Sequence, residues 1–140
     1  MHATVRSVVE AAANEEGEIC ILDTEASPEH FTRGTARYAD AILTVVEPYY
    51  KSLETGRRMA TLARDLGIER VAVVGNKVRD EREREAVQEF ARTHGLELAG
   101  IVPFDERLPE AERAQAAPID FAPDAAAVTA IADIARGFVP

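Results

Sequence analysis

Short apolar runs alternate with longer segments of helical periodicity along this chain. Four runs are nearly continuous in apolar residues, many of them β-branched, as is typical of strands buried on both faces. These predicted strands span residues 18–23, 41–47, 70–76 and 96–103. Elsewhere the apolar residues recur about every 3.6 positions, which predicts helices. The predicted helices span residues 4–14, 28–38, 53–66, 80–94 and 124–137.

Two glycines mark the ends of predicted helices. Gly67 follows Leu66 and Gly95 follows His94, in the position where glycine commonly ends a helix. Strands that alternate with helices predict βαβ units with right-handed crossovers. The expected fold class is α/β, a three-layer domain over residues 1–140 with a parallel sheet of about four strands and helices on both faces.

The longest stretch without a regular pattern spans residues 103–123 and is expected to be irregular. Long loops in compact domains are often functional. The charged run 79–85 alternates in sign at the start of a predicted helix. We interpret this run as a solvated helix face rather than a binding patch.

Composition narrows the class of protein. The 140 residues are 46% hydrophobic but only 6% aromatic, which suits small side chains packed between helices and a sheet. The net charge of −9 opposes binding to nucleic acid. The lone cysteine, Cys20, is expected to be a small core residue in a reducing compartment. No signal-peptide pattern is present and no apolar run approaches the ~18 residues that span a bilayer, so we expect a cytoplasmic protein without membrane contact.

Polar residues follow every predicted strand. They are Asp23-Thr24-Glu25, Glu47-Pro48-Tyr49, Asn76-Lys77 and Pro103-Phe104-Asp105. Ligands of parallel α/β sheets bind at the carboxyl ends of the strands. Asp23 could hold Mg²⁺ through water, and the amide of Asn76 could hydrogen-bond a base edge. Taken singly, each residue can also be an ordinary turn former, and only the set suggests a site.

The segment 27–30, Ser-Pro-Glu-His, has a structural explanation as a helix start with a serine cap and proline in the first position. His30 beside Glu29 invites a metal interpretation, but the other two histidines lie in other predicted elements. We therefore predict no metal ligands. No Ser/His/Asp or Cys/His arrangement supports nucleophilic catalysis.

A Gly-rich phosphate loop, which normally precedes such a sheet in nucleotide-binding proteins, does not occur in these 140 residues. The pattern G-x-x-x-x-G-K-[ST] fails at every glycine. The nearest spacing, Gly95 to Gly100, runs into a predicted strand.

Residues 23–35, Asp-Thr-Glu-Ala-Ser-Pro-Glu-His-Phe-Thr-Arg-Gly-Thr, resemble the switch segment of the MinD/ParA-like ATPases. The resemblance is strongest to the CooC-type accessory ATPases, which help insert nickel into carbon monoxide dehydrogenase. Further segments follow in the order of that family and extend the resemblance over roughly residues 2–123. They are Val46-Glu47-Pro48, Ser52-Leu53-Glu54-Thr55, Gly75-Asn76-Lys77-Val78 and Val102-Pro103-Phe104-Asp105.

The resemblance implies a role for particular residues. Asp23 would position Mg²⁺ and water, and Asn76, followed by Lys77, would read the adenine of ATP. The segment Pro103, Phe104 and Asp105 would lie against the base. The switch residues would be Glu25, Ala26, Glu29, His30 and Arg33.

The sequence also departs from this family. It lacks the phosphate loop, the strand before that loop, and the Cys-x-Cys pair with which the nickel ATPases share a metal between subunits. Either Met1 is an internal methionine of a longer reading frame, or the protein is a natural or engineered half. The expected function is the switch and adenine-recognition part of an ATPase for metallocentre maturation. Alone, the chain is expected to be inactive, with ATP and Mg²⁺ as the family's cofactors.

Three alternatives compete with this function. The first is a non-enzymatic interaction module that forms a homodimer through an open sheet, and a metalloenzyme such as carbon monoxide dehydrogenase is a further candidate partner. The second, a receiver domain with Asp23 as phosphoacceptor, is disfavoured because few acids gather near that residue. The third, DNA or membrane binding as in relatives, is disfavoured by charge and by an acidic last helix.

Overall fold

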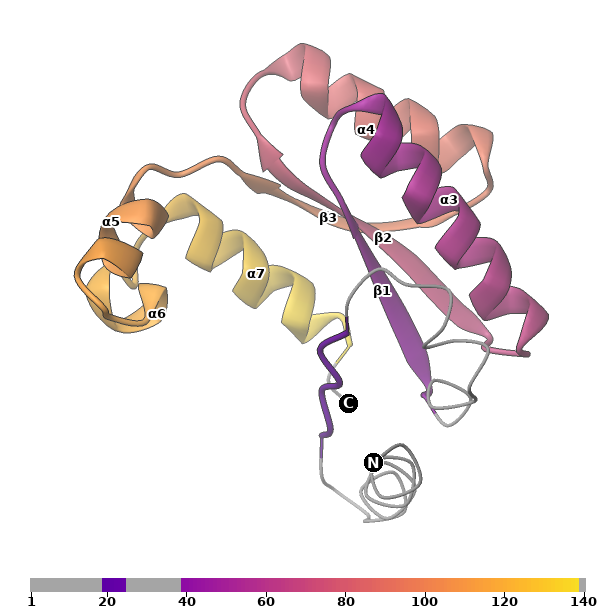
Figure 1. The fold of residues 1–140 in the computed structure, drawn as a ribbon, viewed down its shortest axis with the longest axis horizontal. Helices are drawn as coiled ribbons and strands as arrows, with labels where there is room; N and C mark the ends of the chain where they lie inside the picture. The colour runs from indigo at the N-terminus through magenta and orange to yellow at the C-terminus, as the bar shows by residue number, and fades with distance from the viewer. Residues whose placement is uncertain (1–18, 25–38, 139–140) are drawn as a thin grey trace.

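The computed structural model describes residues 19–24 and 39–138, which form an α/β fold (Figure 1). Strands and helices alternate as far as the third strand, and this confirms the predicted fold class. The elements are β1 (Ala41–Val46), α3 (Tyr50–Asp65), β2 (Arg70–Val78), α4 (Glu81–Thr93), β3 (Glu97–Pro103), α5 (Arg107–Arg113), α6 (Pro118–Phe121) and α7 (Ala126–Arg136).

The sheet of the described residues has three parallel strands in the order β1–β2–β3. β1 pairs with β2 without interruption, from Ala41 opposite Arg70 to Val46 opposite Gly75. The pairing of β2 with β3 is interrupted between Gly75 and Val78. A bulge of this kind redirects the side chains at the end of a strand, and the two residues within it are Asn76 and Lys77.

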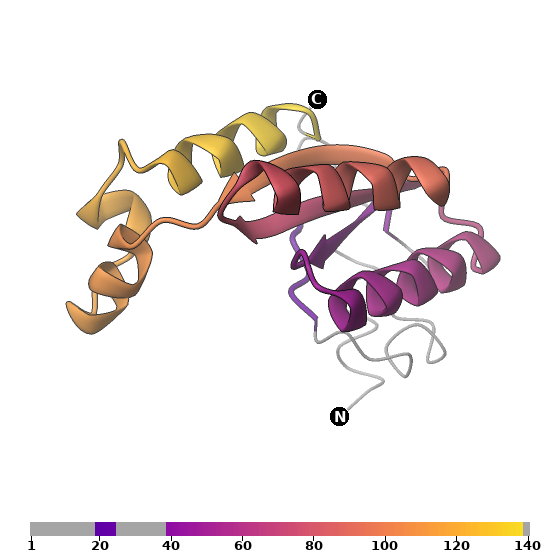
Figure 2. The same ribbon diagram turned by 90° about the horizontal axis from the view of Figure 1, so that it is seen from above.

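Helices cover both faces of the sheet, as predicted (Figure 2). α3 and α4 pack on one face around a core that includes Val46, Val73 and Phe90. α7 lies on the opposite face, where Ile134 packs in a second cluster with Val74. The sheet is therefore the middle of three layers.

Two glycines allow helices to approach the strands closely. A Cβ atom on Gly56 of α3 would lie 2.4 Å from Cγ1 of Val46, and one on Gly100 of β3 would lie 2.5 Å from Cγ1 of Ile134. Packed protein interiors do not accommodate such overlaps without movement. The separations of α3 from β1 and of α7 from β3 therefore depend on glycine.

The two predicted glycine stops are confirmed. Leu66 and His94 are the C-caps of α3 and α4, and the glycines that follow have φ angles of 81° at Gly67 and 59° at Gly95. These positive angles favour glycine because it has no Cβ atom.

The prediction of a strand over residues 18–23 is wrong for the five of them that the structure describes. Residues 19–24 form no strand, and all six are exposed, with Ile21 at 88%. Cys20 is exposed too, so its predicted core position is also wrong. Within the described residues β1 pairs with β2 alone. An apolar run has the pattern of a strand but needs a neighbouring strand to become one.

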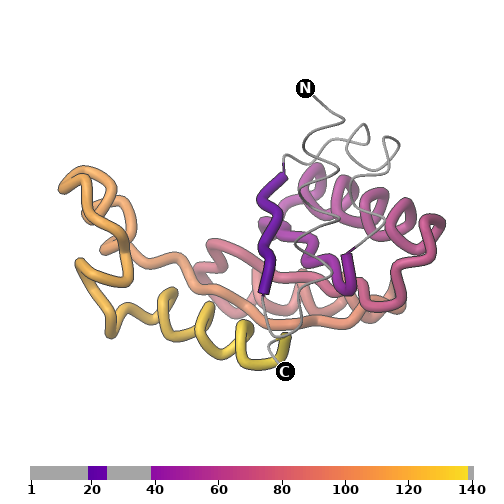
Figure 3. Tube along the Cα trace, turned by 90° about the horizontal axis from the view of Figure 1, so that it is seen from below, coloured from indigo at the N-terminus to yellow at the C-terminus, as the bar shows by residue number. Residues whose placement is uncertain are grey.

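The predicted irregular stretch 103–123 contains two short helices, α5 and α6, which is a second correction. Its prolines do not exclude helices, because Pro109 lies in the first turn of α5 and Pro118 begins α6. The first N–H groups of a helix have no partner within it, so proline costs no hydrogen bond there. In Figures 1 and 3, α5 and α6 project at one end of the molecule, beyond the end of β3.

The predicted helices at 4–14 and 28–38 lie outside the described residues. Among the helices that are described, none combines the length and the apolar character needed to cross a bilayer.

Candidate functional site

An ion pair joins the carboxyl ends of β1 and β2. Nζ of Lys77 lies 2.9 Å from Oε1 of Glu47, and both side chains are partly exposed. The N–H of Glu47 donates to Oγ of Ser52 at 2.9 Å, which ties the end of β1 to the first turn of α3. The loops after the two strands are therefore held together at one edge of the sheet.

Asn76 has a defined orientation at the end of β2. Its side-chain Oδ1 accepts a hydrogen bond from the N–H of Lys77 at 3.0 Å. Lys77 itself has a φ angle of 56°, a left-handed conformation that costs a non-glycine residue about 1–2 kcal/mol. Because Oδ1 faces the backbone, the amide nitrogen of Asn76 is available to donate to a ligand.

Phe104 is fixed between the ends of β2 and β3. Its N–H donates to the carbonyl of Val78 at 2.9 Å. The guanidinium carbon of Arg79 lies 4.1 Å from the centre of the Phe104 ring, a cation–π contact. One charge of the run 79–85 thus helps to hold an aromatic ring, although most of that run is solvated as predicted.

Asp105 is bound within the protein rather than directed toward solvent. Oδ1 accepts from both the backbone N–H and Nε of Arg107 at 3.1 Å, and Oδ2 accepts from Nη2 at 3.1 Å. These bonds, above all those from the Arg107 side chain, lower the pKa of Asp105 to about 2. Arg107 also contacts Asp124 at 3.4 Å.

A pocket of about 450 Å³ lies at this edge of the sheet. It is lined by all five residues for which the family resemblance implies nucleotide binding: Asn76, Lys77, Pro103, Phe104 and Asp105. The remaining wall comes from the segment that the sequence left irregular and comprises Leu108, Pro109, Glu112, Ala116 and Pro118. In the sequence, only the length of that segment and its prolines indicated that it contributes to the site.

Other predicted site residues lie elsewhere. Asp23 is exposed in the segment 19–24 and does not line the pocket. In Figures 1 and 3 that segment lies well away from α5 and α6. The predicted switch residues Glu25, Ala26, Glu29, His30 and Arg33 fall outside the described residues.

The described residues provide no ready magnesium site. Over 19–24 and 39–138, no three His, Cys, Asp or Glu side chains gather closely enough to hold a metal ion. Mg²⁺ prefers six oxygen ligands, several of them water or phosphate. Asp23 alone does not provide such a set, so its role toward Mg²⁺ stays a prediction.

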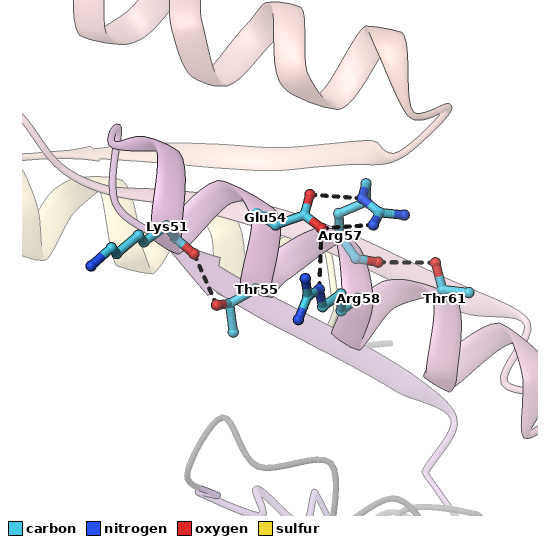
Figure 4. A network of polar contacts seen from close by, with 6 residues as sticks. All are labelled: Lys51, Glu54, Thr55, Arg57, Arg58 and Thr61. Carbon is cyan, nitrogen blue, oxygen red and sulfur yellow. Dashed lines mark hydrogen bonds and ion pairs between the residues drawn. The ribbon is translucent and has the colours of Figure 1, made fainter.

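The family-like segment at the start of α3 has structural roles (Figure 4). Glu54 accepts hydrogen bonds from Arg57 at 2.7 and 2.9 Å and from Arg58 at 3.1 Å. These bonds, chiefly those from Arg57, lower the pKa of Glu54 to about 2. Thr55 donates to the carbonyl of Lys51 at 2.8 Å. This network stabilises the outer face of the helix and adds no side chain to the pocket.

Comparison with known sequences identifies relatives that are longer than this chain. The chain is 33% identical over 122 residues to the carbon monoxide dehydrogenase accessory protein CooC of Rhodospirillum rubrum, covering 87% of this chain and 46% of that protein. It is 46% identical over 96 residues to an uncharacterized ATP-binding protein of Methanocaldococcus jannaschii, covering 68% and 37%. The chain therefore spans less than half the length of these relatives. No family model matches.

Solved structures show the same fold. MinD of Aquifex aeolicus superposes with a TM-score of 0.79 at 22% identity, covering 99% of this chain and 60% of MinD. MinD of Pyrococcus horikoshii, solved with Mg-ADP, superposes with a TM-score of 0.71 at 15% identity, covering 99% and 56%. At these identities the structures establish the fold alone.

Together, the fold and the relatives define the class: the chain belongs to the MinD/ParA-like superfamily of ATPases. Within this superfamily it is homologous to the CooC accessory protein. The family resemblance inferred from residues 23–35 and the later segments is confirmed, and the described residues have the fold of this class of ATPases.

Proposed function

We propose that the chain is the adenine-recognition part of a CooC/MinD-type ATPase and that the pocket beside Asn76 holds the base. The observation that supports this is the meeting of two separate sequence segments. Asn76 and Lys77 at the end of β2, and residues 103–105 at the end of β3, line one pocket although they are distant in sequence.

The chemistry of the pocket suits a flat heteroaromatic ring. Its volume of about 450 Å³ lies within the roughly 300–1,000 Å³ typical of ligand sites. Apolar side chains of Phe104, Leu108 and three prolines supply surfaces for a ring to pack on. Asn76 supplies a directed hydrogen-bond donor. Few polar groups on apolar walls is the usual composition of such sites.

No sequence motif for phosphate binding occurs in these 140 residues. Phosphoryl transfer depends on backbone N–H groups and a lysine around the β- and γ-phosphates, which stabilise the developing charge. No phosphate-loop sequence is present here. We therefore propose that this chain alone binds ATP weakly and does not hydrolyse it, and that Asp23 acts on Mg²⁺ and water only when a phosphate site is supplied.

The proposed role of the whole ATPase is ATP-dependent metallocentre maturation, with nickel as cargo and a metalloenzyme such as carbon monoxide dehydrogenase as the partner. This proposal is supported by the relationship to CooC, whose name describes an accessory protein of that enzyme. We further propose that the protein acts in the cytoplasm.

Adenine recognition can be tested by NMR titration of the ¹⁵N-labelled chain with AMP at millimolar concentration. The Asn76 side-chain amide and the Phe104 backbone amide are expected to shift together in a saturable manner. Asn76→Ala should weaken binding by about 1–3 kcal/mol, because the base then loses its polar partner. Gln88→Ala, which removes an exposed amide from α4, should bind AMP as the wild type does. Saturable shifts that avoid both pocket residues would overturn the proposal.

A second candidate function is a homodimeric interaction module. Leu43 and Val45, on the face of β1 away from α3, are exposed at 41% and 59%. In the described residues β1 has a strand on one side only. An open edge with apolar side chains can pair with another chain, and a second copy of this chain is the partner we propose.

Sedimentation velocity at micromolar concentration tests this candidate. A dimer is expected for the wild type and a monomer for Val45→Lys, because a charge on the paired strand opposes association. Ile131→Lys on α7, also an exposed apolar position, should remain dimeric. A monomeric wild type would exclude this function.

A further inference from the structure

One carboxylate in the pocket has no role in the resemblance described above. Glu112 is an exposed residue of α5. It lines the pocket together with the strand-end residues but comes from a different segment of the sequence. The other charged residues of the lining have partners: Lys77 pairs with Glu47, and Asp105 with Arg107. Within the described part of the chain, no ion pair involves Glu112. Its oxygens are free to accept from a ligand.

Asn76 presents the complementary kind of group. Its Oδ1 accepts from the N–H of Lys77, so its amide nitrogen is the part that can face the pocket, and that nitrogen is a donor. The pocket therefore offers a donor from β2 and an acceptor from α5.

Adenine offers the groups that such a pair would contact. It has an acceptor ring nitrogen next to an amino group that donates. A carboxylate at neutral pH accepts but cannot donate, so it would attract the amino group. Purine riboside has hydrogen in place of that amino group and offers the carboxylate no donor.

We propose that Glu112 is a specificity-determining residue that accepts a hydrogen bond from the C6 amino group of adenine while Asn76 donates to a ring nitrogen. This inference rests on the proposed function, since it assigns one more contact within the same pocket. Selection for adenine then comes from α5, outside the segments shared with the family's recognisable motifs.

Adenosine and purine riboside provide a matched pair of probes, because they differ only in the C6 amino group and need no phosphate site. In NMR titrations of the full chain, the wild type should bind adenosine about tenfold more tightly than purine riboside, because the analogue leaves Glu112 without its donor. Glu112→Ala should lose this preference through weaker adenosine binding. Glu112→Gln, whose side-chain oxygen still accepts, should retain the preference.

Glu110→Ala is the matched control, since it removes an exposed carboxylate from the same helix without touching the pocket. It should keep the wild-type preference. If Glu112→Ala binds adenosine in the pocket and still prefers it tenfold, the role of Glu112 is wrong while adenine recognition stands. If neither nucleoside shifts Asn76 or Phe104 in the wild type, both proposals fail.

Discussion

The guanidinium of Arg107 contacts Asp105 at 3.1 Å and Asp124 at 3.4 Å, so one side chain of α5 joins the end of β3 to the start of α7. Oδ1 of Asp105 also accepts from the backbone N–H of Arg107 at 3.1 Å. Asp105 and Arg107 together therefore hold α5 against the sheet, and Asp105 does so from within the pocket lining.

Asp105→Asn should destabilise the protein in a pH-dependent way. The pKa of Asp105 is lowered from 3.8 to about 2 in the folded chain, chiefly by the Arg107 side chain. Its ionised form therefore adds stability in full above about pH 4, and this contribution is lost as pH falls toward 2. Urea unfolding of both proteins should show a gap in the free energy of unfolding that narrows between pH 4 and 2.

Asp133→Asn provides the control, because Asp133 is an exposed acid paired with Arg136 within α7. Exposed pairs of this kind contribute little to stability. A gap for Asp105→Asn that stays constant from pH 5 to 2 would contradict the role given to its ionised form.

Lys77→Gly should be more stable than Lys77→Ala by about 1 kcal/mol. Both variants delete the ion pair with Glu47, so the difference reports the backbone alone. Lys77 has a φ angle of 56°, which alanine adopts at a cost and glycine adopts freely. Chemical denaturation of the two variants measures the difference. Equal stabilities would mean that the left-handed conformation is not maintained in solution.

Gly100→Ala should destabilise the fold by about 1–3 kcal/mol, because its new methyl group would overlap with Ile134. Ile134→Ala alone should also destabilise, since it leaves a cavity under α7. In the double variant the two changes should compensate in part, giving a smaller loss than their sum. Strict additivity in thermal unfolding would show that α7 does not pack on β3 as described.

The isolated chain should release phosphate from ATP at the background rate, even at millimolar ATP and Mg²⁺. The physical reason is the missing phosphate loop, because Asp23 and Asn76 alone cannot stabilise the charge on the transferred phosphoryl group. A colorimetric phosphate assay measures this. ATP turnover by the wild type that is lost in Asp23→Ala would contradict the prediction. It would show a phosphate site that no sequence motif indicates.

The sequence predicted the middle of the fold well, because local signals there agree. β2 contains the apolar run Val71-Ala72-Val73-Val74, α4 follows the capping residue Asp80, and Gly67 and Gly95 follow the ends of their helices. Each of these elements packs against strands or helices that lie within the described residues. Because ligands of parallel sheets bind at the carboxyl ends of the strands, the sequence also indicated Asn76 and residues 103–105, which line one pocket.

The remaining features depend on tertiary contacts that a local pattern does not contain. Ile19 and Ile21 have the composition of a strand, but no strand of the described residues pairs with them. α5 and α6 were missed because their prolines occupy first turns, where proline is compatible with a helix. Glu112 was missed in consequence, since an acid in an unassigned loop gives no reason to place it in a pocket.

The strands of the sheet are covered to different extents, and this determines how readily the backbone hydrogen bonds of each strand open to solvent. β2 has a strand on each side and helices on both faces, whereas β1 has a strand on one side and two exposed side chains on one face. Backbone amides of β1 should therefore exchange with deuterium through local fluctuations, and those at the centre of β2 only through global unfolding. The slowly exchanging centre of β2 then lies directly before Asn76 in the same strand, so the loops of the pocket can fluctuate while the strand that carries Asn76 remains folded.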